Sequence, residues 1–171
     1  MWKKYGLIGL YGLLVIQSAG AAPVNGAFGV LLGKAPPVDD TVTAYFLDTS
    51  GSVFEFQPLD ANPSLSTYVF YTTPLTDLVY KIEGYTRFFE FKTCEQERRL
   101  INQQLKRQFG RQRNLTRATG NIYASTRFGK GKQKAISSCT GFSGDSKLSL
   151  VVVDEALERQ AKHERHTAEL N

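Results

Sequence analysis

The sequence is poor in the residues that build metal and redox sites. It has two cysteines and two histidines among 171 residues. Two cysteines are too few for a disulfide-dense scaffold or a cysteine-built zinc finger. Hydrophobic residues make up 42% of the chain and charged residues 22%, which excludes disordered, collagen-like and coiled-coil proteins. The sequence therefore predicts one globular domain that is large enough to bury a core.

The first 21 residues have the pattern of a signal peptide. Lys3 and Lys4 precede the apolar run Leu7–Ile16, and small residues surround a cleavage site between Ala21 and Ala22. Glycines and polar residues make the run a poor transmembrane helix, although an uncleaved anchor remains the alternative. We expect a periplasmic or secreted protein with no transmembrane span after cleavage.

Cleavage would leave residues 22–171 as a single domain with Cys94 and Cys139 as its two thiols. In an oxidising compartment, an even number of cysteines predicts one disulfide bond. Closing a loop of this length is worth roughly 4 kcal/mol in the chain-entropy treatment. The alternatives, a reactive thiol or a metal-binding pair, lack support because there is no C-x-x-C motif and no histidine close to either cysteine in sequence.

One segment in the middle of the chain has the 3.6-residue periodicity of an amphipathic helix. Thr93 and Gln96 form a capping-box pattern at its start, and Gly110 stands at its end. Its apolar face includes Cys94, Ile101, Leu105 and Phe109. A second helix is expected from an Asp154 cap to about Glu169.

Alternating apolar residues predict strands elsewhere. The expected strands are 27–32, 42–47, 53–57, 68–72, 78–88, 122–128, 135–139 and 147–153. The polar stretch 111–119 is expected to be a connection. Together these elements predict an α+β fold, with a mostly antiparallel sheet, one central amphipathic helix, one C-terminal helix and a single disulfide bond.

The positive charge is concentrated in one segment. Residues 98–134 contain eleven lysines and arginines and no acidic residue, whereas residues 22–97 contain four basic and ten acidic residues. Such a segment predicts a surface that binds an anionic partner, and arginines suit bidentate contacts to phosphate or carboxylate. The candidate contact residues are Arg99, Lys106, Arg107, Arg111, Arg113, Lys130 and Lys132.

The alternative is that this charge is neutralised within the molecule. In that case the basic segment would pair with acidic residues of the first half, namely Asp39, Asp40, Glu83 or Glu90. The excess of basic over acidic residues implies that some positive surface would remain even then.

No motif predicts catalysis, a cofactor or a metal. Gly144-Asp145-Ser146 resembles the start of some esterases, but no Asp-x-x-His follows it and the segment has the composition of a turn. His163 and His166 are three residues apart on the last helix, where solvated side chains are the usual outcome. We therefore expect no catalytic, cofactor-binding or metal-binding residues.

The predicted function is that of a non-catalytic binding module. Its partner would be an anionic envelope component, either a lipid headgroup or an acidic polysaccharide, or an acidic protein surface; nucleic acid is not expected. The alternative function is an inhibitor or immunity-type protein that blocks a secreted or periplasmic enzyme. There the loop Gly129–Lys132 would insert into an acidic cleft.

Several short blocks along the mature chain resemble a loosely defined group of uncharacterised exported proteobacterial proteins. The blocks are Phe28-Gly29-Val30, Tyr71-Thr72-Thr73-Pro74-Leu75-Thr76, Val79-Tyr80-Lys81-Ile82, Phe109-Gly110 and Leu150-Val151-Val152-Val153-Asp154. The resemblance implies a periplasmic or envelope location and brings no activity and no site residues.

Overall fold

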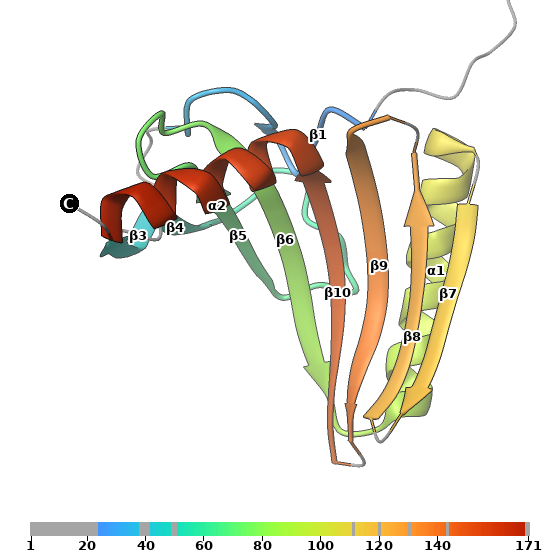
Figure 1. Cartoon of the computed structure of the whole chain (residues 1–171). Helices are drawn as coiled ribbons and strands as arrows, with labels where there is room; N and C mark the ends of the chain where they lie inside the picture. Colours follow the sequence, from blue (N-terminus) through green and yellow to red (C-terminus); the bar gives the residue numbers. More distant parts are fainter. Residues whose placement is uncertain are drawn as a thin grey trace, which may run out of the picture.

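Strands dominate the chain in the computed structural model (Figure 1). The structure describes residues 24–37, 42–48, 51–110, 112–119, 121–129, 131–142 and 144–169; for 44–48, 51, 112–119, 121–123, 142, 168 and 169 it describes the backbone alone. The strands are β1 (Gly26–Ala27), β2 (Val30–Leu31), β3 (Val42–Asp48), β4 (Gly51–Phe56), β5 (Thr67–Thr72), β6 (Val79–Phe88), β7 (Gln112–Thr119), β8 (Asn121–Phe128), β9 (Gln133–Phe142) and β10 (Asp145–Asp154). The helices are α1 (Phe91–Phe109) and α2 (Glu155–Glu169). The signal-peptide prediction falls outside the described residues.

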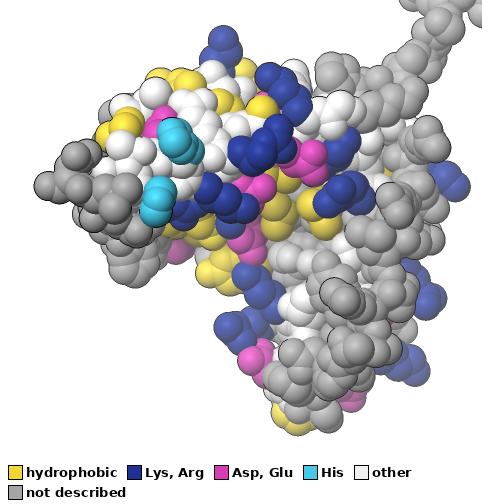
Figure 2. All heavy atoms as spheres, viewed as in Figure 1, with side chains coloured by type: hydrophobic (Ala, Val, Ile, Leu, Met, Phe, Trp, Pro, Cys, Tyr) yellow, Lys and Arg dark blue, Asp and Glu magenta, His cyan; other side chains and the backbone are white. Residues whose placement is uncertain are grey.

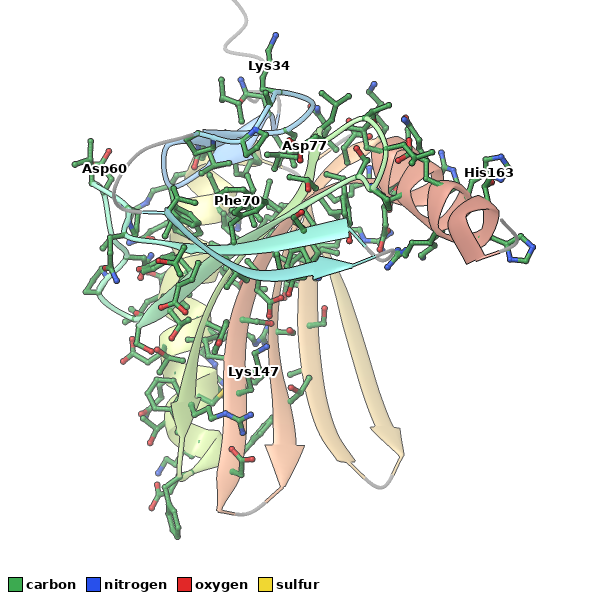
Figure 3. All side chains as sticks on the ribbon, turned by 90° about the vertical axis from the view of Figure 1, so that its left-hand side faces the viewer. Lys34, Asp60, Phe70, Asp77, Lys147 and His163 are labelled. Carbon is green, nitrogen blue, oxygen red and sulfur yellow. A yellow bond between two sulfur atoms is a disulfide. The ribbon has the colours of Figure 1, made fainter. Side chains whose placement is uncertain are left out.

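Eight of these strands form one antiparallel sheet in the order β3-β4-β5-β6-β10-β9-β8-β7. The last strand in sequence lies at the centre, where Leu150 is opposite Gly84 of β6 on one side and Ser137 of β9 on the other. The sheet is strongly twisted, so that in Figure 3 β3 and β4 run across the direction of β7–β10. The prediction of an α+β fold with a mostly antiparallel sheet is confirmed.

The two helices lie on opposite sides of the sheet (Figure 3). α1 packs against β8, β9 and β10, while α2 crosses the other face next to β6 and β10 (Figure 1). The core fills the α1 side because alternate residues of each strand point there. Phe70, Ile82, Leu148 and Ile101 are at most 1% exposed in this core. We call the opposite side of the sheet the α2 face.

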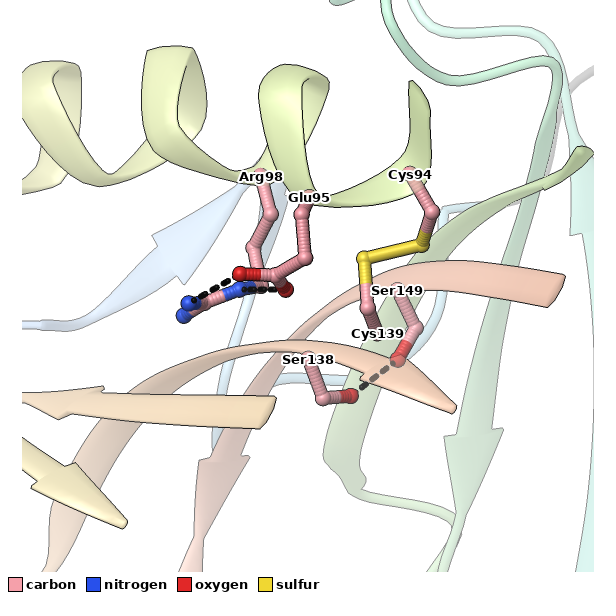
Figure 4. The surroundings of a disulfide bond; sticks show 6 residues. All are labelled: Cys94, Glu95, Arg98, Ser138, Cys139 and Ser149. Carbon is pink, nitrogen blue, oxygen red and sulfur yellow. Dashed lines mark hydrogen bonds and ion pairs between the residues drawn. A yellow bond between two sulfur atoms is a disulfide. The ribbon is translucent and has the colours of Figure 1, made fainter. Parts of the chain in front are cut away.

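The disulfide bond between Cys94 and Cys139 joins the first turn of α1 to β9 (Figure 4). Both cysteines are fully buried, and their Cα atoms lie 6.0 Å apart. The predicted pairing is confirmed, and it indicates an oxidising compartment. In the part of the chain that the structure describes, no helix has the length and apolar character needed to cross a membrane.

The periodicity of α1 is confirmed, but the prediction of its start is wrong. Its buried residues are the four that the 3.6-residue period selects: Cys94, Ile101, Leu105 and Phe109. The helix begins at Phe91, before the expected capping box, and the Cys94 N–H bonds to the carbonyl oxygen of Glu90, whose side chain makes no cap. At the other end Gly110 takes a positive φ of 70° and closes the last turn on Lys106, as predicted.

The second helix is confirmed at both ends. The Asp154 carboxylate accepts hydrogen bonds from the N–H groups of Ala156 (2.9 Å) and Leu157 (3.3 Å), so the last residue of β10 caps α2. Glu164 fixes the helix to the β5–β6 loop by accepting a hydrogen bond from the Leu75 N–H (2.8 Å). α2 is therefore docked at a polar contact as well as through the fully buried Ala161.

Two strand predictions are wrong. The segment expected to be one strand over 27–32 is a hairpin, β1–β2, whose turn places Phe28 and Gly29 at positive φ. The polar stretch 111–119 is not a connection, because residues 112–119 form β7 at the edge of the sheet. An edge strand pairs on one side, so its backbone can join the sheet without an apolar alternation in its sequence.

Candidate anion-binding surface

The outward side of α1 carries a row of cations and amides. The residues lie opposite the buried face because they recur at intervals of three and four along the helix. Lys92, Gln96, Arg99, Gln103, Lys106 and Arg107 are all exposed, and we call this row the α1 stripe. Lys92, Arg99 and Lys106 are seven residues apart, so the stripe extends over roughly 21 Å of helix axis.

The acidic side chains within α1 are engaged elsewhere. Glu95 forms an ion pair with Arg98, with 2.6 Å between Oε1 and Nε, and both side chains are mostly buried (Figure 4). Glu97 accepts a 2.6 Å hydrogen bond from the Ser64 hydroxyl in the loop beside the helix. The stripe itself therefore carries positive charge with no carboxylate among its residues.

The ion pairs of the described residues do not include the stripe cations. Within the described residues, the ammonium groups of Lys92 and Lys106 and the guanidinium groups of Arg99 and Arg107 have no acidic partner. Lys106 and Arg107 also lie in the last turn of α1, where positive charge is favoured by the carbonyl end of the helix dipole. As far as the described residues show, these four groups can meet an anion from solution.

The structure brings three of the seven predicted contact residues together. Arg99, Lys106 and Arg107 lie on the stripe. Lys132 lies instead in the β8–β9 turn, where its Nζ is 3.8 Å from Asp154 Oδ2. Arg111 and Lys130 are outside the described residues, and Arg113 lies in β7 with its side chain outside them.

Internal neutralisation accounts for part of the basic segment. Arg98 pairs with Glu95, Arg127 pairs with Glu155 at 3.7 Å, and Lys132 pairs with Asp154, as described above. Of the acidic residues expected to serve as partners, Asp39 and Asp40 lie outside the described residues, and Glu90 is exposed before α1. Glu83 binds lysines from outside the basic segment.

Glu83 is the centre of a charged network on the α2 face. Its carboxylate lies 2.7 Å from the Lys147 ammonium and 3.8 Å from that of Lys81, and it accepts a hydrogen bond from the Tyr71 hydroxyl (3.3 Å). The Lys81 ammonium also lies over the Tyr71 ring, 3.5 Å from its centre, and that of Lys147 lies 4.2 Å from the ring centre of Tyr85.

Burial and these contacts shift the ionisation of the network. Burial lowers the pKa of Lys81, an effect that the nearby Glu83 carboxylate partly offsets. Burial, together with the charge of Glu83, raises the pKa of the Tyr71 hydroxyl. Both lysines contact the one Glu83 carboxylate and each lies against a tyrosine ring, so the charged groups of this network already have partners within the protein. Figure 2, which views this face, shows cations and acids interspersed at its centre, whereas Lys and Arg project along the right-hand margin, where α1 lies in Figure 1.

A small pocket opens beside the α1 stripe. It lies between the loop before β5 and the second half of α1, with a volume of about 210 Å³. Its walls are Asn62, Pro63, Ser64, Leu100, Ile101, Gln103, Gln104 and Arg107. Sequence reasoning missed this pocket because the loop residues that line it, Asn62, Pro63 and Ser64, carry no charge or motif. It missed Lys92 because that residue precedes the acid-free segment. The seven-residue spacing of Lys92, Arg99 and Lys106 is the sequence signal that could have identified Lys92.

The α1 stripe and its pocket present cations, amides and a hydroxyl group. Among the described residues, no three His, Cys, Asp or Glu side chains gather closely enough to hold a metal ion. His163 and His166 are exposed on α2. Comparison with protein families and with curated proteins finds no match to this chain. The arrangement itself, an uncompensated cationic helix face beside a polar pocket, is suited to binding an anion.

Proposed function

We propose that the protein is an exported, non-catalytic binding module, acting in the periplasm or after secretion, that docks an anionic partner on the α1 stripe. The observation that carries this proposal is the contrast within one helix. Glu95 and Glu97 are engaged by Arg98 and Ser64, while four cations on the opposite side have no acidic partner among the described residues. A surface of this kind attracts phosphate or carboxylate groups at long range and holds them through hydrogen bonds.

The fold supports the proposal by holding the stripe rigid. The Cys94–Cys139 disulfide and the buried Ile101 and Leu105 fix the inner side of α1 to the sheet. The cations are therefore pre-organised, and binding costs mainly their side-chain entropy. The attraction acts across solvent, so affinity would fall steeply as salt rises.

The test compares two variants with the same change in net charge. In the first, Arg99, Lys106 and Arg107 are replaced by glutamine; in the second, the exposed Lys34, Arg159 and Lys162 are replaced instead. Binding is measured to polyuronate and to phosphatidylglycerol vesicles at low and high salt. We expect the stripe variant to lose at least about tenfold in affinity and most of its salt dependence, and the control to retain both. Equal losses in both variants would contradict the proposal.

A second candidate function is an inhibitor that presents the β8–β9 turn to an enzyme. The supporting observation is that this turn is anchored, since the Glu155 N–H bonds to the Lys132 carbonyl oxygen (2.9 Å) and Asp154 contacts the Lys132 ammonium. Such an inhibitor would capture one enzyme at about nanomolar strength and lose it on Lys132→Glu, whereas the triple stripe variant would still bind.

A further inference from the structure

The α1 stripe and its adjoining pocket together define a ligand more specific than an anion. We propose that they bind a linear acidic polysaccharide that carries one carboxylate per disaccharide, with one sugar ring seated in the pocket. This inference rests on the proposed function, because it names the partner of the same surface. It has two independent supports, the spacing of the cations and the chemistry of the pocket.

The cations repeat at the pitch of a disaccharide. Lys92, Arg99 and Lys106 follow one another every seven residues, which is about 10 Å along the helix axis. An extended polysaccharide advances by a similar distance for each two-sugar unit. Gln96 and Gln103 fill the intervals between the cations, and their amides can donate to and accept from sugar hydroxyls. Along the stripe, cations that can contact carboxylates thus alternate with amides that can contact sugar hydroxyls, as such a polysaccharide would require.

The pocket offers the groups that bind a single polar ring. Three amides, one hydroxyl and one guanidinium line it, together with apolar surface from Pro63, Leu100 and Ile101. The Gln103 amide and the Arg107 guanidinium have no polar partner among the described residues, so both remain available to a sugar hydroxyl and its carboxylate. A polar, partly apolar recess beside a cation fits a uronate ring.

The loop wall of the pocket is held in place before any ligand arrives. The Asn62 side chain accepts from the Ser64 N–H (2.9 Å) and donates to the Gln104 side chain (3.1 Å). The buried Tyr68 hydroxyl donates to the carbonyl oxygens of Asn62 (3.0 Å) and Leu65 (3.1 Å). Because these bonds tie the loop to itself, to β5 and to α1, the pocket is pre-organised for binding.

A lipid surface fits these observations less well. Binding to a bilayer uses apolar side chains that enter the membrane between the cations. Leu100, which is 52% exposed, lies at the pocket rather than between the cations, and Phe89, which is 78% exposed, precedes the helix. Glutamines occupy those positions instead. We therefore treat binding to anionic lipid as the competing outcome of the test.

The experiment uses two matched substitutions on one helix. Gln103→Ala removes an amide from the pocket wall, whereas Gln96→Ala removes an equivalent exposed amide from the stripe away from the pocket. The probes are hyaluronate oligosaccharides, with one carboxylate per disaccharide, polygalacturonate, with one per sugar, neutral dextran, and phosphatidylcholine vesicles containing one quarter phosphatidylglycerol. Affinities are measured by calorimetry at low and at physiological salt.

We expect hyaluronate to bind at least as tightly as polygalacturonate despite its lower charge density, because its carboxylates match the cation spacing. Gln103→Ala should weaken hyaluronate binding by about fivefold and Gln96→Ala by less than about twofold, the loss expected for one hydrogen bond in a recess against one in open solvent. Neutral dextran should bind weakly or not at all.

Three results would overturn the inference. Polygalacturonate binding more tightly in proportion to its charge would show a plain electrostatic surface, and equal effects of Gln103→Ala and Gln96→Ala would remove the pocket from the site. Tighter binding to the vesicles than to hyaluronate would assign the stripe to lipid. In each case the stripe still binds anions, whereas salt-insensitive binding or none to every charged probe would refute the proposed function itself.

Discussion

The carboxylate of Glu164, on α2, accepts a 2.8 Å hydrogen bond from the backbone N–H of Leu75, in the loop between β5 and β6. Thr76 and Gln160 donate to the same carboxylate, at 3.3 and 2.7 Å. Burial alone would raise the pKa of Glu164, but these hydrogen bonds outweigh it and hold the pKa below its ordinary value. The ionised form of Glu164 thus holds the C-terminal helix to the sheet.

This contact predicts a loss of stability in acid. A carboxyl with a lowered pKa in the folded state contributes fully above the ordinary glutamate pKa of about 4.3, and the contribution disappears as pH falls through the lower native value. Glu164→Gln should cost about 1–3 kcal/mol at pH 7 and progressively less below pH ~4. Urea unfolding across this range would measure it, with Glu158→Gln, at a partly exposed glutamate of the same helix, as a control. A cost that stays constant with pH would contradict the prediction.

Removal of the disulfide should destabilise the protein without changing its fold. The bond spans 45 residues of sequence, so its loss relaxes a long loop in the unfolded chain. Replacing both Cys94 and Cys139 by serine should lower the free energy of unfolding by about 2–5 kcal/mol. Adding reductant to the wild-type protein should reproduce that shift and leave the variant unaffected. An identical unfolding midpoint with and without reductant would show that the bond contributes nothing.

The two ion pairs between β6 and β10 should contribute unequally to the stability of the protein. Glu83 is 8% exposed and pairs with two lysines, so Glu83→Gln should cost about 2 kcal/mol by removing the carboxylate that both ammonium groups contact. Arg87 and Asp145 are both more than 60% exposed, so solvent screens their attraction and Asp145→Asn should cost clearly less. Thermal unfolding of both variants would compare them. Equal costs would mean that burial does not set the strength of these pairs.

Two glycines with positive φ should tolerate alanine differently. A methyl group at Gly141, in β9, would collide with the carbonyl oxygen of Asp145 across the β9–β10 hairpin. At Gly131, in the β8–β9 turn, the same group would meet no atom within 4 Å and would add backbone strain alone. Gly131→Ala should cost about 1–2 kcal/mol and Gly141→Ala clearly more, as read from unfolding midpoints. The reverse order would refute the hairpin geometry.

Local sequence signals predicted the elements with strong periodicity. The 3.6-residue pattern through Ile101 and Leu105 placed α1 and the inner face that holds Cys94, since each apolar position repeats one turn later. β7 was missed because its sequence, QRNLTRAT, lacks an apolar alternation. The segment is a strand because its backbone pairs with β8, and a side-chain pattern does not show that pairing. The start of α1 was missed because its first turn bonds to the backbone of Glu90 and uses no capping side chain.

The candidate site could be predicted in part for the same reason. Charge is visible in sequence, so Arg99, Lys106 and Arg107 could be selected from the acid-free segment. Counting charged residues along the sequence cannot show which cations already form ion pairs within the protein, as Arg98 does with Glu95. The pocket depends on the loop around Asn62 meeting a helix some forty residues later, a contact that no local pattern encodes.

The position of β10 has a consequence for how the molecule is made. β10 pairs with β6, some sixty residues earlier, and with β9, so it joins the two halves of the sheet. Such non-local pairing raises the contact order and slows folding. Until residues 145–154 are available, β3–β6 and β7–β9 have no strand between them. A chain that emerges from its N-terminus can therefore complete this sheet only after residues 145–154 have been released.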